Sequence, residues 1–255
     1  MWMRILAPVF LGLGLWGAAM ADPAMIDPAK ADPAGFVDDF KSIDTGWHVA
    51  DYRFTHPMFD TDWSAGQIGL DKGLTLSLDP QKGQANRFVG GSIRREEVSH
   101  FGRYEVTLRA ARGAGLVTGF FTYTGPHYGT RHDEIDIEFL GRDTTQLHAA
   151  WFVDGELTEH FIDLGFDAAA RMETYAFEWY PDRLRWFAGE RLIFEHHAAD
   201  GAIPTVPGRL FLNLWAADPS IANWAGTTPE GQAGKAVVTD VRFQPFAPTG
   251  PSVQK

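Results

Sequence analysis

Short runs of alternating apolar and polar residues fill this chain from Phe36 onward. The runs are rich in Val, Ile, Thr and aromatic residues and are separated by Gly, Asp-Gly, Pro-Asp and Asn turns, which is typical of β-strands. No segment has a convincing amphipathic helical period and strands do not alternate with helices, so doubly wound and α/β-barrel folds are excluded. We therefore predict an all-β protein, a β-sandwich or jelly roll of two stacked sheets.

The predicted strands are short and regularly spaced. They comprise residues 74–78, 91–95, 104–110, 117–123, 134–139, 147–152, 160–164, 174–180, 184–187, 192–195, 210–215 and 236–243.

The first 34 residues lack this alternation. Arg4 precedes an apolar run from Ile5 to Trp16, and small residues end the stretch before Asp22, which is typical of a signal peptide at residues 1–21. A membrane anchor is the alternative, although the run is shorter than the roughly 20 residues that a spanning helix needs. Residues 22–34 repeat Asp-Pro-Ala and predict a flexible lead-in. We expect one domain at residues 35–247, a tail at 248–255, and a secreted or periplasmic protein.

Composition excludes several classes of site and partner. The chain has no cysteine, which excludes disulfides and thiolate metal sites. It has 22 basic and 33 acidic side chains, and removal of Arg4 with residues 1–21 would change the net charge from −11 to −12. This balance disfavours nucleic acids and anionic membranes, so we expect no nucleic-acid partner and no membrane contact after signal cleavage. We also expect a monomer.

The most informative segment runs from His132 to Gly141, where acidic and apolar residues alternate. On a strand, Glu134, Asp136 and Glu138 would share one face while the apolar residues between them pack into the core. Three carboxylates on one face repel one another, so a purely structural strand would be destabilised by them. This pattern favours a chemical role.

Two carboxyl groups that flank a bond are the groups that glycoside cleavage needs, and a retaining mechanism places them about 5 to 5.5 Å apart. Positions i and i+4 lie roughly 13 Å apart along a strand, and two long Glu side chains can close most of that gap. Asp136 can hydrogen-bond one glutamate, and crowded negative charge raises the pKa of the carboxyl that must stay protonated. A solvated acidic edge strand and a calcium site remain alternatives.

Several motifs in family order resemble family 16 of the glycoside hydrolases, specifically the bacterial lichenases, which are endo-β-1,3-1,4-glucanases. The likeness covers roughly residues 36–246. Its motifs are Phe120 to Pro126, Asp133 to Gly141, Asp143 to Thr145, Leu164 to Asp167, Tyr175 to Trp179, Pro207 to Gly208 and Asn213 to Trp215. The resemblance implies a concanavalin A-like β-jelly roll of two antiparallel sheets, with a concave cleft for a linear glucan.

The resemblance also implies roles for individual residues. Glu134 corresponds to the nucleophile, Glu138 to the general acid/base and Asp136 to the assisting acid of a retaining mechanism, and no cofactor is expected for catalysis. Sugars need aromatic faces and fixed polar partners. The substrate-binding candidates are Arg94, Phe121, Tyr123, His132, Trp151, Asn213 and Trp215. Trp179 and Trp186 are assigned to the core.

A structural calcium ion far from the cleft is a further implication of the resemblance. The Asp240 side chain and backbone oxygens near Asp39 and Gly73 would hold the ion, and oxygen ligands suit calcium. An ordinary strand-end role for Asp240 is the alternative.

The chain departs from the lichenase pattern where sugars would bind. His132 replaces a tryptophan, Ser92 replaces a glutamate, and residues 150–152 replace an Asn-x-Tyr. We expect His132 to pack or to hydrogen-bond substrate, with a pH-sensitive role as the alternative. Mixed-linkage β-glucan is the first expectation for substrate, ahead of a succinoglycan-like bacterial exopolysaccharide. A transglycosylase and a non-catalytic carbohydrate-binding module also remain open.

Overall fold

The computed structural model describes residues 34–43 and 46–246. The expected signal peptide, all of the lead-in except Ala34, and the C-terminal tail lie outside the described residues.

Seventeen strands make up most of the described chain. They are β1 (Phe36–Asp38), β2 (Trp47–Val49), β3 (Thr61–Trp63), β4 (Ile68–Leu70), β5 (Leu74–Pro80), β6 (Phe88–Gly90), β7 (Ser92–Ser99), β8 (Gly102–Arg109), β9 (Leu116–Thr124), β10 (Asp133–Leu140), β11 (Gln146–Val153), β12 (Glu156–Asp163), β13 (Glu173–Trp179), β14 (Arg183–Ala188), β15 (Arg191–His197), β16 (Gly208–Ala216) and β17 (Gly234–Pro245). The helical segments are α1 (Ala222–Ala225) and three short 3-10 turns, η2 (Ala65–Gln67), η3 (Pro126–Tyr128) and η4 (Pro219–Ile221).

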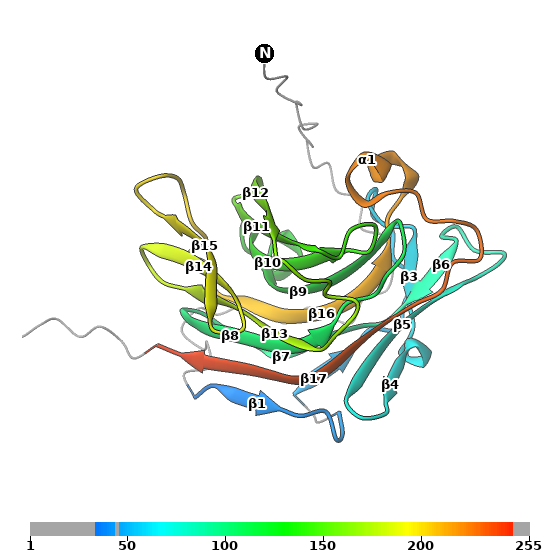
Figure 1. Cartoon of the computed structure of the whole chain (residues 1–255), viewed down its shortest axis with the longest axis horizontal. Helices are drawn as coiled ribbons and strands as arrows, with labels where there is room; N and C mark the ends of the chain where they lie inside the picture. Colours follow the sequence, from blue (N-terminus) through cyan, green and yellow to red (C-terminus); the bar gives the residue numbers. More distant parts are fainter. Residues whose placement is uncertain (1–33, 44–45, 247–255) are drawn as a thin grey trace, which may run out of the picture.

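The strands form two stacked, curved sheets (Figure 1). One sheet has ten strands, with the path β15-β14-β13-β8-β17-β5-β6-β3, β1 paired to β17 and β4 paired to β5. The other has seven strands in the order β12-β11-β10-β9-β16-β7-β2. Among these described strands, every pair is antiparallel except β3 with β6. This architecture confirms the prediction of an all-β sandwich.

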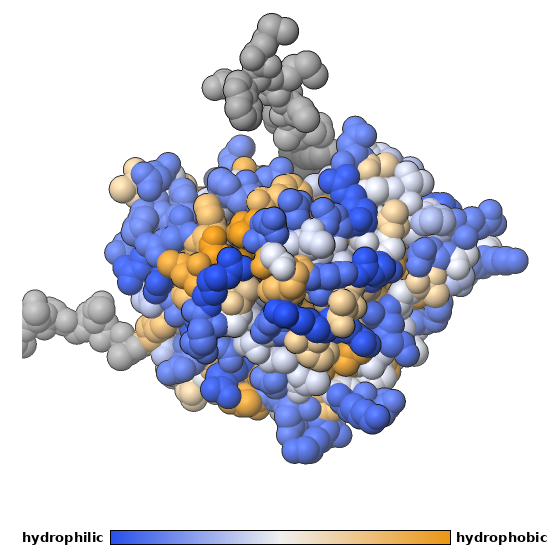
Figure 2. Space-filling view, in the orientation of Figure 1, coloured by the Kyte–Doolittle hydropathy of each residue, from blue (hydrophilic) through white to orange (hydrophobic). Residues whose placement is uncertain are grey.

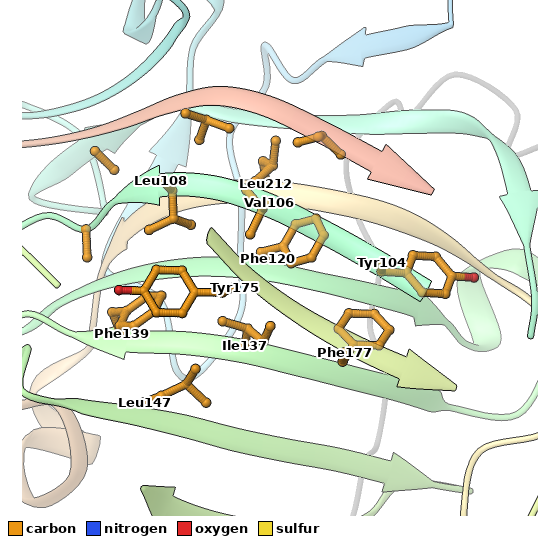
Figure 3. Packing of buried hydrophobic residues seen from close by; sticks show 14 of the residues in the cluster. Tyr104, Val106, Leu108, Phe120, Ile137, Phe139, Leu147, Tyr175, Phe177 and Leu212 are labelled. Carbon is orange, nitrogen blue, oxygen red and sulfur yellow. The ribbon is translucent and has the colours of Figure 1, made fainter. Parts of the chain in front are cut away.

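A hydrophobic core fills the space between the sheets. Strands β8 and β13 of the ten-stranded sheet contribute Tyr104 and Phe177, whose rings stack with centroids 4.7 Å apart. Phe120, Ile137 and Phe139 come from the opposite sheet and are fully buried (Figure 3). Trp179 and Trp186 are also buried in this cluster, as predicted. The side of the seven-stranded sheet turned away from this core is called the open face below.

The exterior in the view of Figure 2 is mostly hydrophilic, with hydrophobic residues in small patches. Within residues 34–43 and 46–246, no helix has the length and apolar character needed to cross a membrane.

Candidate active site

Strand β10 carries the three acids of the sequence motif on the open face. Ile135 and Ile137, which alternate with the acids, have no exposed surface and face the core. The side chains of Glu134 and Glu138 keep 15% and 16% exposure. Asp136, which lies between the two glutamates, is buried at 4% exposure. The alternation of the sequence therefore places two accessible carboxyl groups on either side of a buried one.

Two contacts on the core side hold this strand in place. The Asp133 carboxylate, at the start of β10, accepts backbone hydrogen bonds from Asp154, Thr205 and Val206 at 3.1, 2.8 and 3.1 Å. The indole of Trp186, from the opposite sheet, donates to the Asp136 backbone carbonyl at 2.9 Å. Asp133 and Trp186 are both buried, so these hydrogen bonds fix the backbone of β10 from the core side.

The surroundings of the central acid favour its neutral form. Burial, the negative charges of Glu134 and then Glu138, and a hydrogen-bonding contact with Glu134 all raise the pKa of Asp136 well above its usual range. From the sequence we expected a raised pKa at the general acid; in the structure a raised pKa is found at Asp136. A neutral Asp136 removes one negative charge from the row, and its hydroxyl can donate a hydrogen bond to Glu134.

Neighbouring strands bring the other open-face residues into register with the acids. On β9, Tyr123, Phe121 and Gly119 lie opposite Glu134, Asp136 and Glu138. On β16, Arg209, Phe211 and Asn213 continue these three rows. On the other side, β11 places Phe152, Ala150 and His148 opposite the same acids.

Three of the predicted substrate-binding residues surround Glu134. The His132 imidazole Nε2 lies 2.5 Å from Glu134 Oε2, and its ring stacks on Phe152 at 4.6 Å. Tyr123 lies 5.3 Å from the His132 ring, and burial followed by the charge of Glu134 raises the pKa of its hydroxyl. Phe121 stacks on Phe211 at 5.1 Å. His132 therefore contacts the candidate nucleophile directly, in addition to being available to substrate.

Three more predicted residues also lie on the open face. Arg94 donates to the Tyr128 hydroxyl at 3.3 Å and retains 21% side-chain exposure. Asn213 approaches the row at Glu138, and its buried Oδ1 has no hydrogen-bond partner among the described residues. Trp215 is only 3% exposed because Phe59 stacks on it at 4.0 Å.

The prediction that Trp151 forms a wall of the cleft is wrong. Trp151 pairs with Ile135 rather than with an acid, so its side chain points into the core. It is 1% exposed, lies 5.6 Å from Trp186, and donates its indole N–H to the Ala202 carbonyl. Its neighbour Phe152 occupies the open face instead.

Sequence reasoning missed a buried histidine beside Glu138. The two ring nitrogens of His148 contact Glu138 Oε2 at 3.0 Å and Glu159 Oε2 at 2.8 Å. Burial opposes protonation of this ring, but the two carboxylates outweigh burial and raise the pKa of His148 to about 9. Glu138 and His148 are ten residues apart and meet only through the β10–β11 register, which no turn motif in the sequence specifies.

The loop before β3 also contributes to the site, although none of its residues was among the predicted site residues. His56 stacks on Phe54, and the ring of Phe59 covers Trp215. Burial lowers the pKa of His56, and the negative charge of Glu134 acts against that shift, so the loop reaches the acid row. Trp224 of α1 stacks on the same Trp215 at 6.0 Å and lies 5.5 Å from His148.

The three positions expected at a calcium site lie around one irregularity in β17. The β17–β8 register shifts between Val238 and Asp240, and an added Cβ on Gly73 would lie 2.4 Å from the Val238 carbonyl oxygen. Asp38, the residue before Asp39, pairs with Val241, the residue after Asp240. The described part of the chain has no group of three or more His, Asp or Glu side chains arranged so that they could hold one metal ion. A calcium site here would therefore use backbone oxygens and one carboxylate, which is the ligand set expected from the sequence.

The open face supports acid–base and nucleophilic chemistry on a sugar. Two accessible carboxyl groups can act on one bond, and aromatic rings with fixed donors beside them can hold pyranose rings.

Comparisons with known proteins agree with this geometry. The sequence model of glycosyl hydrolases family 16 matches residues 55–237. A beta-glucanase of Bacillus subtilis (strain 168) is 37% identical over 199 residues, which cover 76% of this chain and 81% of that protein. A Bacillus licheniformis beta-glucanase is 35% identical over 234 residues, which cover 90% and 92% of the two chains.

Solved structures show the same fold. A crystal structure of Bacillus licheniformis beta-glucanase superposes with a TM-score of 0.78 at 34% identity and covers 83% of this chain and 98% of that chain. A prokaryotic β-1,3-1,4-glucanase (lichenase) derived from a mouse hindgut metagenome gives 0.78 at 32% identity, with 83% and 99% covered. These matches confirm the predicted jelly-roll class.

Proposed function

Because this chain belongs to family 16 of the glycosyl hydrolases and is a glycoside hydrolase, we propose that it is an endo-acting β-glucanase that cleaves mixed β-1,3-1,4-linked glucan with retention. The observation that carries this proposal is the row of two accessible glutamates on either side of a buried aspartate on the open face.

In this proposal Glu134 is the nucleophile. Its carboxylate attacks the anomeric carbon, and Asp136 donates a hydrogen bond to it. Glu138 protonates the departing glycosidic oxygen and then removes a proton from the water that releases the glycosyl-enzyme. Phe121, Phe211 and Tyr123 would stack on or donate to the sugars that flank the bond.

A bacterial exopolysaccharide is the second candidate substrate. Its support is that the residues around the acids differ from the lichenase pattern at His132 and Phe152, which form a stacked pair beside Glu134. The secretion of the protein is part of the same proposal, because a polymer outside the cell requires an exported enzyme and residues 1–21 have a signal-peptide pattern.

The test uses purified residues 22–255 with barley β-glucan, lichenan, laminarin, carboxymethylcellulose and a succinoglycan-type polymer. Reducing ends, viscosity and product sizes would be recorded, with Glu134→Gln as the inactive control. We expect rapid viscosity loss on mixed-linkage glucans alone. Cleavage of the exopolysaccharide alone would make that polymer the substrate in place of mixed-linkage glucan. Products longer than a supplied oligosaccharide would indicate transglycosylation. Binding without cleavage would contradict the proposed hydrolase activity.

We also propose that a calcium ion is held by Asp240 and nearby backbone oxygens, on the evidence of the register shift in β17 and the close approach of Gly73. The ion would stabilise the ten-stranded sheet and take no part in the reaction.

A further inference from the structure

His148 and Glu159 form a chain of contacts that ends on the acid/base candidate. The three residues come from adjacent strands, with Glu138 on β10, His148 on β11 and Glu159 on β12. Both nitrogens of the imidazole face a carboxylate oxygen, at 3.0 Å for Glu138 and 2.8 Å for Glu159. A ring with an acceptor on each side is held most favourably when both nitrogens carry protons.

The surroundings fix this imidazole in one orientation. Its side chain is only 4% exposed, the Phe161 ring stacks on it at 4.5 Å, and Trp224 meets it edge-on at 5.5 Å. A buried ring clamped by two aromatic groups cannot rotate freely, so the Nδ1–H direction toward Glu138 is set by packing. The protein thus places a fixed donor on one oxygen of a carboxyl group that must work at the reaction centre.

We propose that His148 and Glu159 are positioning residues for the acid/base Glu138. Glu159 holds His148 in its doubly protonated form, and His148 occupies Glu138 Oε2 with its Nδ1–H. When Glu138 is protonated, its proton must then reside on Oε1, because Oε2 already accepts a hydrogen bond. His148 gives up no proton during the cycle, and the proton that leaves Oε1 in the first step is replaced from water in the second. This inference rests on the proposed role of Glu138.

The charged groups around His148 support a lasting positive charge. Glu138 faces it from β10 and Glu159 from β12. Burial is the main cause that lowers the pKa of His160, also on β12; His148 acts in the same direction and Glu159 against it. Arg142 and Asp143 of the β10–β11 loop lie with His148 around one small cavity and are opposite in sign. From α1, the neighbouring side chain is the uncharged indole of Trp224.

The experiment compares the wild type with His148→Gln, Glu159→Gln and the control Glu156→Gln. Glu156 is an exposed acid on the same strand as Glu159, and the odd spacing between the two residues places their side chains on opposite faces of β12. For each protein, kcat and KM would be followed from pH 5 to 10 on the polymer that the wild type cleaves. The same proteins would be assayed on aryl β-glycosides of a short oligosaccharide with good and poor leaving groups.

We expect His148→Gln to lower kcat on the polymer by about 10- to 100-fold, with little change in KM; this is less than the roughly 10²- to 10⁴-fold that a general acid–base group itself contributes, because His148 acts through Glu138. The kcat on dinitrophenyl glycosides should fall less, because the dinitrophenolate leaving group departs without protonation. The alkaline limb of kcat/KM should move up by about one pH unit, since loss of a nearby cation favours protonated Glu138. Glu159→Gln should give a smaller shift in the same direction, and Glu156→Gln none.

Unchanged pH limbs and equal losses on both leaving groups would overturn the inference, as would an effect of Glu156→Gln equal to that of Glu159→Gln. If His148→Gln does not fold, the partly exposed Glu159→Gln variant decides the question alone. A wild type that cleaves neither polymers nor aryl glycosides removes the proposed function, and the positioning roles with it. An active wild type with unaffected variants removes only the positioning roles.

Discussion

At the scale of single residues, the acid row is stable because its members are electrostatically unequal. Burial and the charges of Glu134 and Glu138 raise the pKa of Asp136, which favours a neutral group between the two glutamates over a third charge. This raised pKa lowers the free energy of unfolding at neutral pH, because the aspartate is ionised in the unfolded chain. Asp136 is therefore expected to lower stability while it supplies a hydrogen-bond donor beside the nucleophile.

The substitution Asp136→Asn should raise the melting temperature at pH 7. The folded pKa of Asp136 lies above its unfolded value of 3.8, so the wild type loses stability as pH rises above about 4, whereas the amide of the variant has no proton to lose. The difference between the two melting curves should shrink toward zero as pH falls below about 4. Thermal unfolding from pH 3.5 to 8 would check this, with exposed Asp200→Asn as the control. A variant less stable than the wild type at pH 7 would refute the argument.

At the scale of elements, β11 shows how one strand divides its side chains between core and site. Trp151 faces inward against Trp186, while its neighbours Ala150 and Phe152 lie opposite Asp136 and Glu134. A period of two places every odd position of this strand on the core side and every even position on the open face, beside the acids.

This division predicts opposite results for two adjacent aromatic residues. Trp151→Ala should lower the free energy of unfolding by about 3 to 5 kcal/mol, since it removes a buried indole and leaves a cavity. Phe152→Ala should cost far less stability and should instead raise KM, because it removes the ring under His132. Urea unfolding and steady-state kinetics on the cleaved polymer separate the two effects. A strong KM effect from Trp151→Ala in fully folded protein would contradict the assignment.

Sequence alternation predicted all twelve described strands longer than three residues, including β10 with its acids, because runs of six or more residues show their period clearly. It missed β1, β2, β3, β4 and β6, which have three residues each and too few positions to define a period. It also missed His148, since a contact between Glu138 and His148 depends on strand register, and the connection between β10 and β11 leaves that register open. Trp151 was assigned to the cleft because an indole can stack on a sugar, although its odd position on β11 places the side chain in the core.

At the scale of the whole molecule, the two sheets have separate tasks. The seven-stranded sheet carries the acids and the aromatic rings around them, and the ten-stranded sheet carries the Trp186 contact that holds β10 from behind. The strands β1, β4, β5 and β17, where calcium is proposed, all belong to the ten-stranded sheet on the far side from the acid row (Figure 1). Changes there should reach the site only through global stability.

Calcium should therefore raise stability without changing the rate of the folded enzyme. At a free calcium concentration 100 times Kd, a ligand that binds only the folded state adds about 2.7 kcal/mol, which for a chain of this size is a rise of roughly 5 to 10 °C in Tm. EGTA should reverse the rise, and Asp240→Asn should abolish the response, while Asp200→Asn should retain it. At 25 °C the kcat of calcium-loaded and EGTA-treated enzyme should agree. Equal Tm values with and without calcium would argue for Asp240 as an ordinary residue of β17, whereas a loss of kcat in fully folded EGTA-treated enzyme would place the ion at the reaction centre instead.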